Sequence, residues 1–122
     1  MATQQKPAAP PKDATNLLEL IPQPRVEWLQ EQDRRVVLLI PRFGSGRLGQ
    51  WLETQLKARP VRIRLDEIGS ATWLLIDGRR TIEDIGKTLQ KQFGAKVEPI
   101  YERLAVFFKQ LEREKLIAMI SR

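Results

Sequence analysis

Few residues in this chain could do chemistry, and their types exclude most reaction classes. The 122 residues include no Cys and no His, which excludes thiolate chemistry, imidazole acid–base catalysis and the usual Cys and His metal sites. Carboxylates, Ser/Lys pairs or a bound cofactor remain for catalysis, and a weak enzyme could be built on two pairs of adjacent carboxylates, Asp66–Glu67 and Glu83–Asp84. Neighbouring side chains on a helix point apart, and acidic residues at a helix start favour its dipole. We therefore interpret both pairs as helix N-terminal charges and expect no enzyme and no cofactor.

The excess of positive charge is local. The net charge is +6, and residues 25–64 hold nine basic and four acidic side chains. Arg62 and Arg64 belong to this stretch, and in a strand they point to the same face. A solvated sheet face explains this pattern, while a nucleic-acid or acidic membrane surface is the alternative use of a basic patch.

Hydrophobic runs in the chain are short. The longest aliphatic run, Val36–Ile40, has five residues, whereas a membrane-spanning helix needs about 20. The polar, Pro-rich residues 1–16 lack the apolar region of a secretory signal. We expect no membrane span, a cytoplasmic location, and one domain, 17–122, after a disordered tail, 1–16.

Three strands are predicted. The runs VEWLQ and VVLLI are separated by the polar EQDRR and predict a hairpin, whose second strand is apolar on both faces and must be covered on each. Val61, Ile63 and Leu65 alternate with Arg62 and Arg64, a period of two that predicts a half-buried third strand with its apolar side inward.

A short helix is expected between the second and third strands. It follows the loop PRFGSG, where Ser45 is the candidate cap, and ends before Pro60. Its apolar stripe is Leu48, Trp51, Leu52 and Leu56. We interpret Trp51 as a staple that holds this helix to the sheet, with an apolar surface for a partner enzyme as the alternative.

Three helices are expected after the third strand. Asp66 is the expected cap of the first, Thr81 and Asp84 have capping-box spacing at the second, and Pro99 suits the first turn of the third. The core stripe of the last helix is expected to be Ile100, Leu104, Phe107 and Leu111. Residues 116–120 close the chain as a short strand or an apolar tail. The fold class is α+β: a winged-helix-like, three-stranded antiparallel sheet followed by three helices, with an extra short helix inserted before the third strand.

The stretch VRIRLDEIGSATWLLIDGRRTIEDIGKTLQKQFG, followed by ERLAVFFKQLEREKLI, resembles the PqqD-like family. The resemblance covers about residues 61–117, and LDEIGS to IDGRRTIEDI is its most specific part. It implies that residues 17–122 form a PqqD-like winged-helix domain that recognises precursor peptides. Such domains dock a leader peptide beside the third strand and against the third helix, and present it to a modifying enzyme, often a radical-SAM protein.

The residues themselves favour the same site. In a three-stranded meander the third strand is an edge that can accept an incoming strand. A second apolar flank of the last helix lies beside its core stripe. The predicted peptide-binding residues are Val61, Arg62, Ile63, Arg64, Leu65, Tyr101, Ala105 and Phe108. Either aromatic is open to the alternative of being part of the core.

DNA and a second copy of this chain are the other candidate partners. A DNA-binding winged helix is the alternative function, but Glu102, Glu112 and Glu114 offset the basic residues of the last helix, which disfavours nucleic acid. Exposed strand edges also allow a homodimer, which the sequence does not decide.

Overall fold

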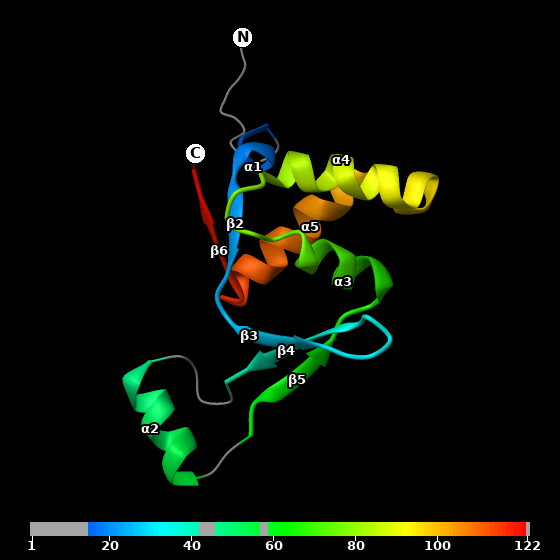
Figure 1. Cartoon of the computed structure of the whole chain (residues 1–122). Helices are drawn as coiled ribbons and strands as arrows, with labels where there is room; N and C mark the ends of the chain where they lie inside the picture. The colour runs from blue at the N-terminus through cyan, green and yellow to red at the C-terminus, as the bar shows by residue number, and fades with distance from the viewer. Residues whose placement is uncertain (1–14, 42–45, 57–58, 122) are drawn as a thin grey trace. The chain divides into compact units, whose positions relative to one another are not determined.

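The computed structural model describes residues 15–41, 46–56 and 59–121. The described residues form two compact units (Figure 1). Residues 26–74 make one unit, and the described residues on either side of that range make the other. Each unit has its own sheet. None of the described helices is long and apolar enough to span a membrane.

The unit of residues 26–74 is built on a three-stranded antiparallel sheet of β3 (Glu27–Gln30), β4 (Val36–Ile40) and β5 (Val61–Arg64), in that order. Helix α2 (Arg47–Leu56) is inserted between β4 and β5, and α3 (Glu67–Leu74) follows β5 and packs on β4. The first three residues of β4 are buried whichever way they point. The predicted hairpin, third strand and inserted helix are therefore confirmed.

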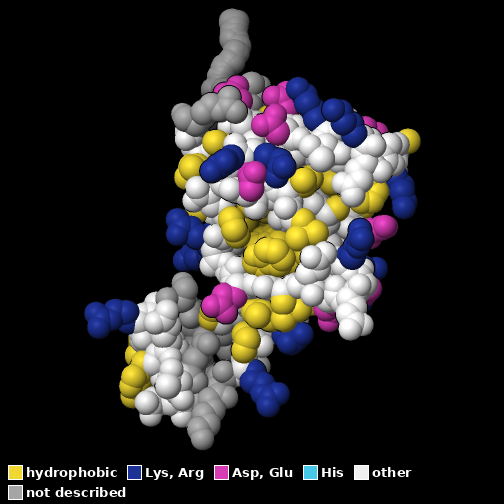
Figure 2. Space-filling view, in the orientation of Figure 1, with side chains coloured by type: hydrophobic (Ala, Val, Ile, Leu, Met, Phe, Trp, Pro, Cys, Tyr) yellow, Lys and Arg dark blue, Asp and Glu magenta, His cyan; other side chains and the backbone are white. Residues whose placement is uncertain are grey.

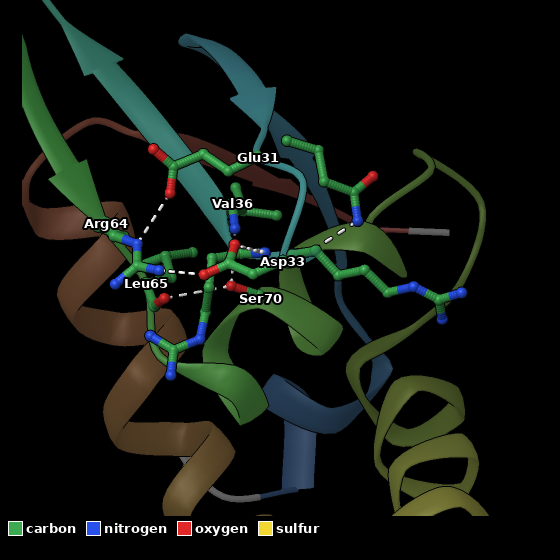
Figure 3. A network of polar contacts seen from close by, with 9 residues as sticks. Glu31, Asp33, Val36, Arg64, Leu65 and Ser70 are labelled. Carbon is green, nitrogen blue, oxygen red and sulfur yellow. Dashed lines mark hydrogen bonds and ion pairs between the residues drawn. The ribbon is translucent and has the colours of Figure 1, made fainter.

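A serine hydroxyl links the ends of β4 and β5. The Leu65 N–H donates to the Val36 carbonyl at 2.8 Å. The Val36 N–H donates instead to Ser70 Oγ at 2.8 Å, and that hydroxyl donates to the Leu65 carbonyl at 3.3 Å (Figure 3). Because Ser70 is only 3% exposed, its hydroxyl replaces a strand-to-strand hydrogen bond that water would not readily supply. Helix α3 is thereby tied to both strands.

Helix α3 begins as the sequence predicted. The Gly69 N–H donates to Asp66 Oδ1 at 2.6 Å, which confirms Asp66 as the cap. A Cβ at position 69 would lie 2.9 Å from this oxygen. Glycine therefore lets the carboxylate reach the first turn.

The second unit pairs the chain's two terminal strands. Strand β2 (Ile21–Pro24) follows α1 (Thr15–Glu19) and pairs antiparallel with β6 (Ile117–Ile120). Helix α4 (Ile82–Phe93) packs against α1 and α5 (Ile100–Arg113), and η2 (Gly94–Val97) connects α4 to α5 (Figure 1). Most of the predicted tail lies outside the described residues, but Thr15 and Asn16 begin α1.

The start of α4 has the predicted capping box. The Asp84 N–H donates to Thr81 Oγ1 at 3.1 Å, and the Thr81 N–H donates to Asp84 Oδ2 at 3.3 Å. Gly94 ends the helix with a φ of 64°, a conformation that favours glycine. The α+β class, with a three-stranded antiparallel sheet and several helices, is thus confirmed, and the winged-helix likeness and the exact order of its elements stay predictions.

The core stripe of α5 differs from the prediction by one residue. The buried residues are Ile100, Leu104, Phe108 and Leu111, whereas Phe107 is half-buried. Around the helix, Phe107 lies about 40° to one side of the mean direction of Ile100, Leu104 and Leu111, and Phe108 lies about 60° to the other side, so the sequence periodicity does not clearly separate the two rings. They pack edge-to-face with centroids 5.5 Å apart. The prediction of Phe108 as an accessible peptide contact is therefore wrong, since its side chain is fully buried.

Replacing Phe108 by Ala is expected to lower the free energy of unfolding by about 3–5 kcal/mol, because it leaves a cavity in the core. Val106→Ala is the matched control on the same helix. Val106 is 68% exposed, so its truncation is expected to change stability by less than about 0.5 kcal/mol. Urea unfolding measures both variants, and equal effects would contradict the core assignment.

Ser70→Ala is expected to lower the free energy of unfolding by about 1–3 kcal/mol, because it leaves the buried Val36 N–H without a partner. Thr88→Ala serves as control, since the Thr88 hydroxyl bonds only within α4 at an exposed position. If Ser70→Ala lowers the free energy of unfolding no more than the control does, the Ser70 hydroxyl contributes nothing to stability.

Candidate functional site

Strand β5 is an edge of its sheet. It pairs with β4 on one side, and no other described strand pairs with it. All four of its residues are exposed, and Val61 and Ile63 each keep 41% of their surface accessible. The prediction that the apolar side of this strand turns inward is therefore wrong. An edge strand has a neighbour on one side only, so its side chains lack the cover that a central strand receives.

The register shows which backbone groups of β5 are open. The Leu65–Val36 pair is hydrogen-bonded, and hydrogen-bonded pairs recur at every second residue of an antiparallel ladder. Residues 61, 63 and 65 therefore direct their N–H and C=O groups to β4, while Arg62 and Arg64 direct theirs to the open edge. Pro60, just before the strand, has no N–H to offer. The open edge is thus centred on Arg62 and Arg64.

The two faces of β5 differ in chemistry. Ile63 lies opposite Leu38, which lies opposite Trp28, so one face carries a row of apolar side chains across all three strands. Arg62 and Arg64 are on the other face. Figure 2 shows hydrophobic and basic side chains close together on the surface of this sheet. An extended partner at this edge would therefore meet apolar and basic neighbours in alternation.

Arg64 is already held within its own unit. Its Nε donates to Glu31 Oε1 at 2.8 Å, and Nη2 forms an ion pair with Asp33 Oδ2 (Figure 3). The pKa of Asp33 is lowered by a hydrogen bond from the Arg35 N–H and by the charge of Arg64. The pKa of Arg64 is raised by its hydrogen bond to Glu31 and by the charge of Asp33. The guanidinium is thus engaged before any partner arrives.

Arg62 is not engaged in this way. Within the described part of the chain its side chain makes no hydrogen bond or ion pair. Glu27 lies on the same face of the sheet, but Leu39 on β4 separates the two residues. Two strand spacings put them roughly 10 Å apart. Arg62 is therefore the cation of β5 that remains available to a partner.

The predicted contacts on α5 belong to the other compact unit. Tyr101 and Ala105 are half-buried, and Phe108 is buried. The Tyr101 ring packs on α4, because a Cβ at Gly86 would lie 2.5 Å from Tyr101 Cε1. Tyr101 thus has a role in packing, and with Ala105 it stays a predicted peptide contact.

The staple interpretation of Trp51 is wrong. Trp51 is 57% exposed and Leu48 is 71% exposed, so this part of the α2 stripe faces solvent. Hydrophobic side chains are visible on the surface of α2 in Figure 2. The predicted cap Ser45 and the Leu56 side chain lie outside the described residues.

Sequence reasoning missed the acidic partners of Arg64. Glu31 and Asp33 were treated only as part of a polar turn. Once the hairpin is in register, however, odd-numbered residues of β3 share a face with Arg62 and Arg64. That parity would have placed Glu31 on the face of Arg64.

In the described ranges, no cluster of three or more acidic residues could hold a metal ion.

Comparison with known proteins identifies the family. Residues 58–117 match the model of the family PqqD, described as coenzyme PQQ synthesis protein D. The match includes the whole of β5, α3, α4 and α5. No curated protein and no solved structure matches the chain significantly. Residues 58–117, about half of the chain, therefore belong to the PqqD family of biosynthetic accessory proteins.

Proposed function

We propose that this chain is a non-catalytic module that captures a precursor (leader) peptide by adding it as a strand to β5, and presents it to a modifying enzyme. The observation that carries the proposal is the one-sided pairing of an exposed strand within the matched region. The expected enzyme partner is a radical-SAM protein, as the resemblance of the sequence implies.

Strand addition suits the open edge of β5. The N–H and C=O groups of Arg62 and Arg64 offer an incoming strand the same hydrogen bonds that β4 receives on the other side. Such backbone pairing supplies affinity without requiring a particular peptide sequence. Selectivity then depends on the side chains that flank the new strand.

Strand β3 is the rival edge of the same sheet. By the same register argument, Trp28 and Gln30 direct their backbone groups away from β4. Two observations favour β5. The family match includes β5 and excludes β3, and Arg62 on β5 offers an unengaged cation.

The alternative of DNA binding gains no support from α5. The exposed residues of this helix carry both signs of charge, among them Glu102, Arg103, Lys109 and Glu112. A helix that enters the major groove usually presents a clearly basic face to the phosphates. The peptide is therefore the partner that we propose.

Arg62→Pro tests backbone capture. It removes an N–H that points to the open edge and leaves the bonds to β4 intact, and proline is tolerated at such edge positions. Peptides recovered from a displayed random library by selection on the full chain are titrated by calorimetry. We expect the tightest peptide to bind Arg62→Pro at least about tenfold more weakly, the equivalent of about 1.4 kcal/mol.

Two matched variants separate the loss of the backbone N–H at position 62 from the loss of the Arg62 side chain and from pairing at β3. Arg62→Ala keeps the backbone N–H and is expected to weaken binding by no more than about fivefold, the loss that corresponds to an exposed ion pair. Gln30→Pro removes the corresponding outward N–H from β3 and is expected to bind like the unaltered protein. Undiminished binding by Arg62→Pro, or an equal loss in Gln30→Pro, would contradict capture at β5.

A further inference from the structure

We infer that β5 selects peptide strands with an apolar–acidic–apolar triplet, in which the acidic side chain lies beside Arg62. This inference rests on the proposed capture of a peptide by β5. It adds the class of peptide that the strand would accept, and it makes Arg62 the residue that determines specificity.

The alternation of side chains in a strand sets the pattern. A residue added opposite Arg62 places its side chain on the basic face, and its two neighbours place theirs on the apolar face beside Val61 and Ile63. The triplet has the same order in both directions. The expected pattern therefore does not depend on whether the peptide adds parallel or antiparallel to β5.

The apolar positions of the triplet follow from exposure. Val61 and Ile63 are each 41% exposed, and on β4 they lie opposite Ile40 and the buried Leu38. An aliphatic or aromatic side chain on the peptide would remove this apolar surface from water. A polar side chain would gain no hydrogen-bond partner among these neighbours.

The acidic position follows from the contrast between the two arginines. Arg64 is shared by Glu31 and Asp33, so a further carboxylate beside it meets two negative charges already in place. Arg62 has no such partner among the described residues. An added strand would remove water from one side of this lone guanidinium, and a carboxylate opposite it supplies the missing partner.

Selection from a displayed library of random peptides tests the pattern. The probe is the full chain, either unaltered or as Arg62→Glu. We expect apolar–acidic–apolar triplets to be enriched on the unaltered protein and apolar–basic–apolar triplets on Arg62→Glu. Enrichment of the same charge on both proteins would overturn the inference.

Affinities of one recovered peptide measure the pairing. Changing its acidic residue from Glu to Gln is expected to weaken binding to the unaltered protein about two- to fivefold, as for an exposed ion pair. The same change is expected to have no effect on binding to Arg62→Gln. An equal loss on both proteins would show that the carboxylate does not contact Arg62.

Releasing Arg64 provides the matched control. In the double variant Glu31→Gln, Asp33→Asn this guanidinium loses both of its negatively charged partners. We expect its selected peptides to carry a second acidic residue two positions from the first. Selection of an unchanged pattern would contradict the view that these two carboxylates keep Arg64 from acting on the peptide.

The outcomes distinguish the preference for an acidic triplet from the proposed capture of peptides by strand addition to β5. Recovered peptides that fail to bind Arg62→Pro but show no preference for charge would support strand addition and overturn the triplet. Recovered peptides that bind Arg62→Pro as tightly as the unaltered protein would overturn both.

Discussion

Strand β5 is hydrogen-bonded along one edge, to β4, and the proposed function depends on its other edge having no partner strand among the described residues. Backbone N–H and C=O groups of a strand are satisfied in pairs, and here the set that points to β4 is used, while the set at Arg62 and Arg64 has no partner strand in the described part of the chain. Groups at an open edge are ordinarily hydrogen-bonded by water. In the proposed capture, a peptide strand would take the place of that water without any rearrangement of the ladder already formed.

Polar contacts around the sheet keep this edge in place. The Ser70 hydroxyl closes the gap between the Val36 N–H and the Leu65 carbonyl, where the two strands part. On the outer face, Arg64 joins the end of β5 to the turn that connects β3 and β4, through Glu31 and Asp33. Each of these two exposed ion pairs contributes little to the stability of the fold by itself. Together the two contacts commit Arg64 to the fold, whereas Arg62 has no such partner among the described residues and is the arginine that we propose for a ligand.

The elements of the fold were largely predictable, and their burial was less so. Pro, Gly and capping residues act locally, so the start of α3 could be predicted from Asp66, and the two ends of α4 could be predicted from Thr81 and Gly94. Side-chain cover depends on distant neighbours instead. For that reason the exposure of Ile63 and Trp51 was missed, as was the choice between Phe107 and Phe108. The strand β2 was missed because its pairing with β6 joins opposite ends of the chain. Within the candidate site, the sequence predicted the edge strand β5. It did not predict that Glu31 and Asp33 hold the Arg64 side chain.

Amide hydrogen exchange followed by NMR, with and without a bound peptide recovered from the displayed library, tests capture at β5 most directly. The account predicts slower exchange at the amides of Arg62 and Arg64, and no change at Ile63, whose N–H already points to β4. Protection confined to Trp28 and Gln30 on β3, or no protection at Arg62 and Arg64, would contradict it.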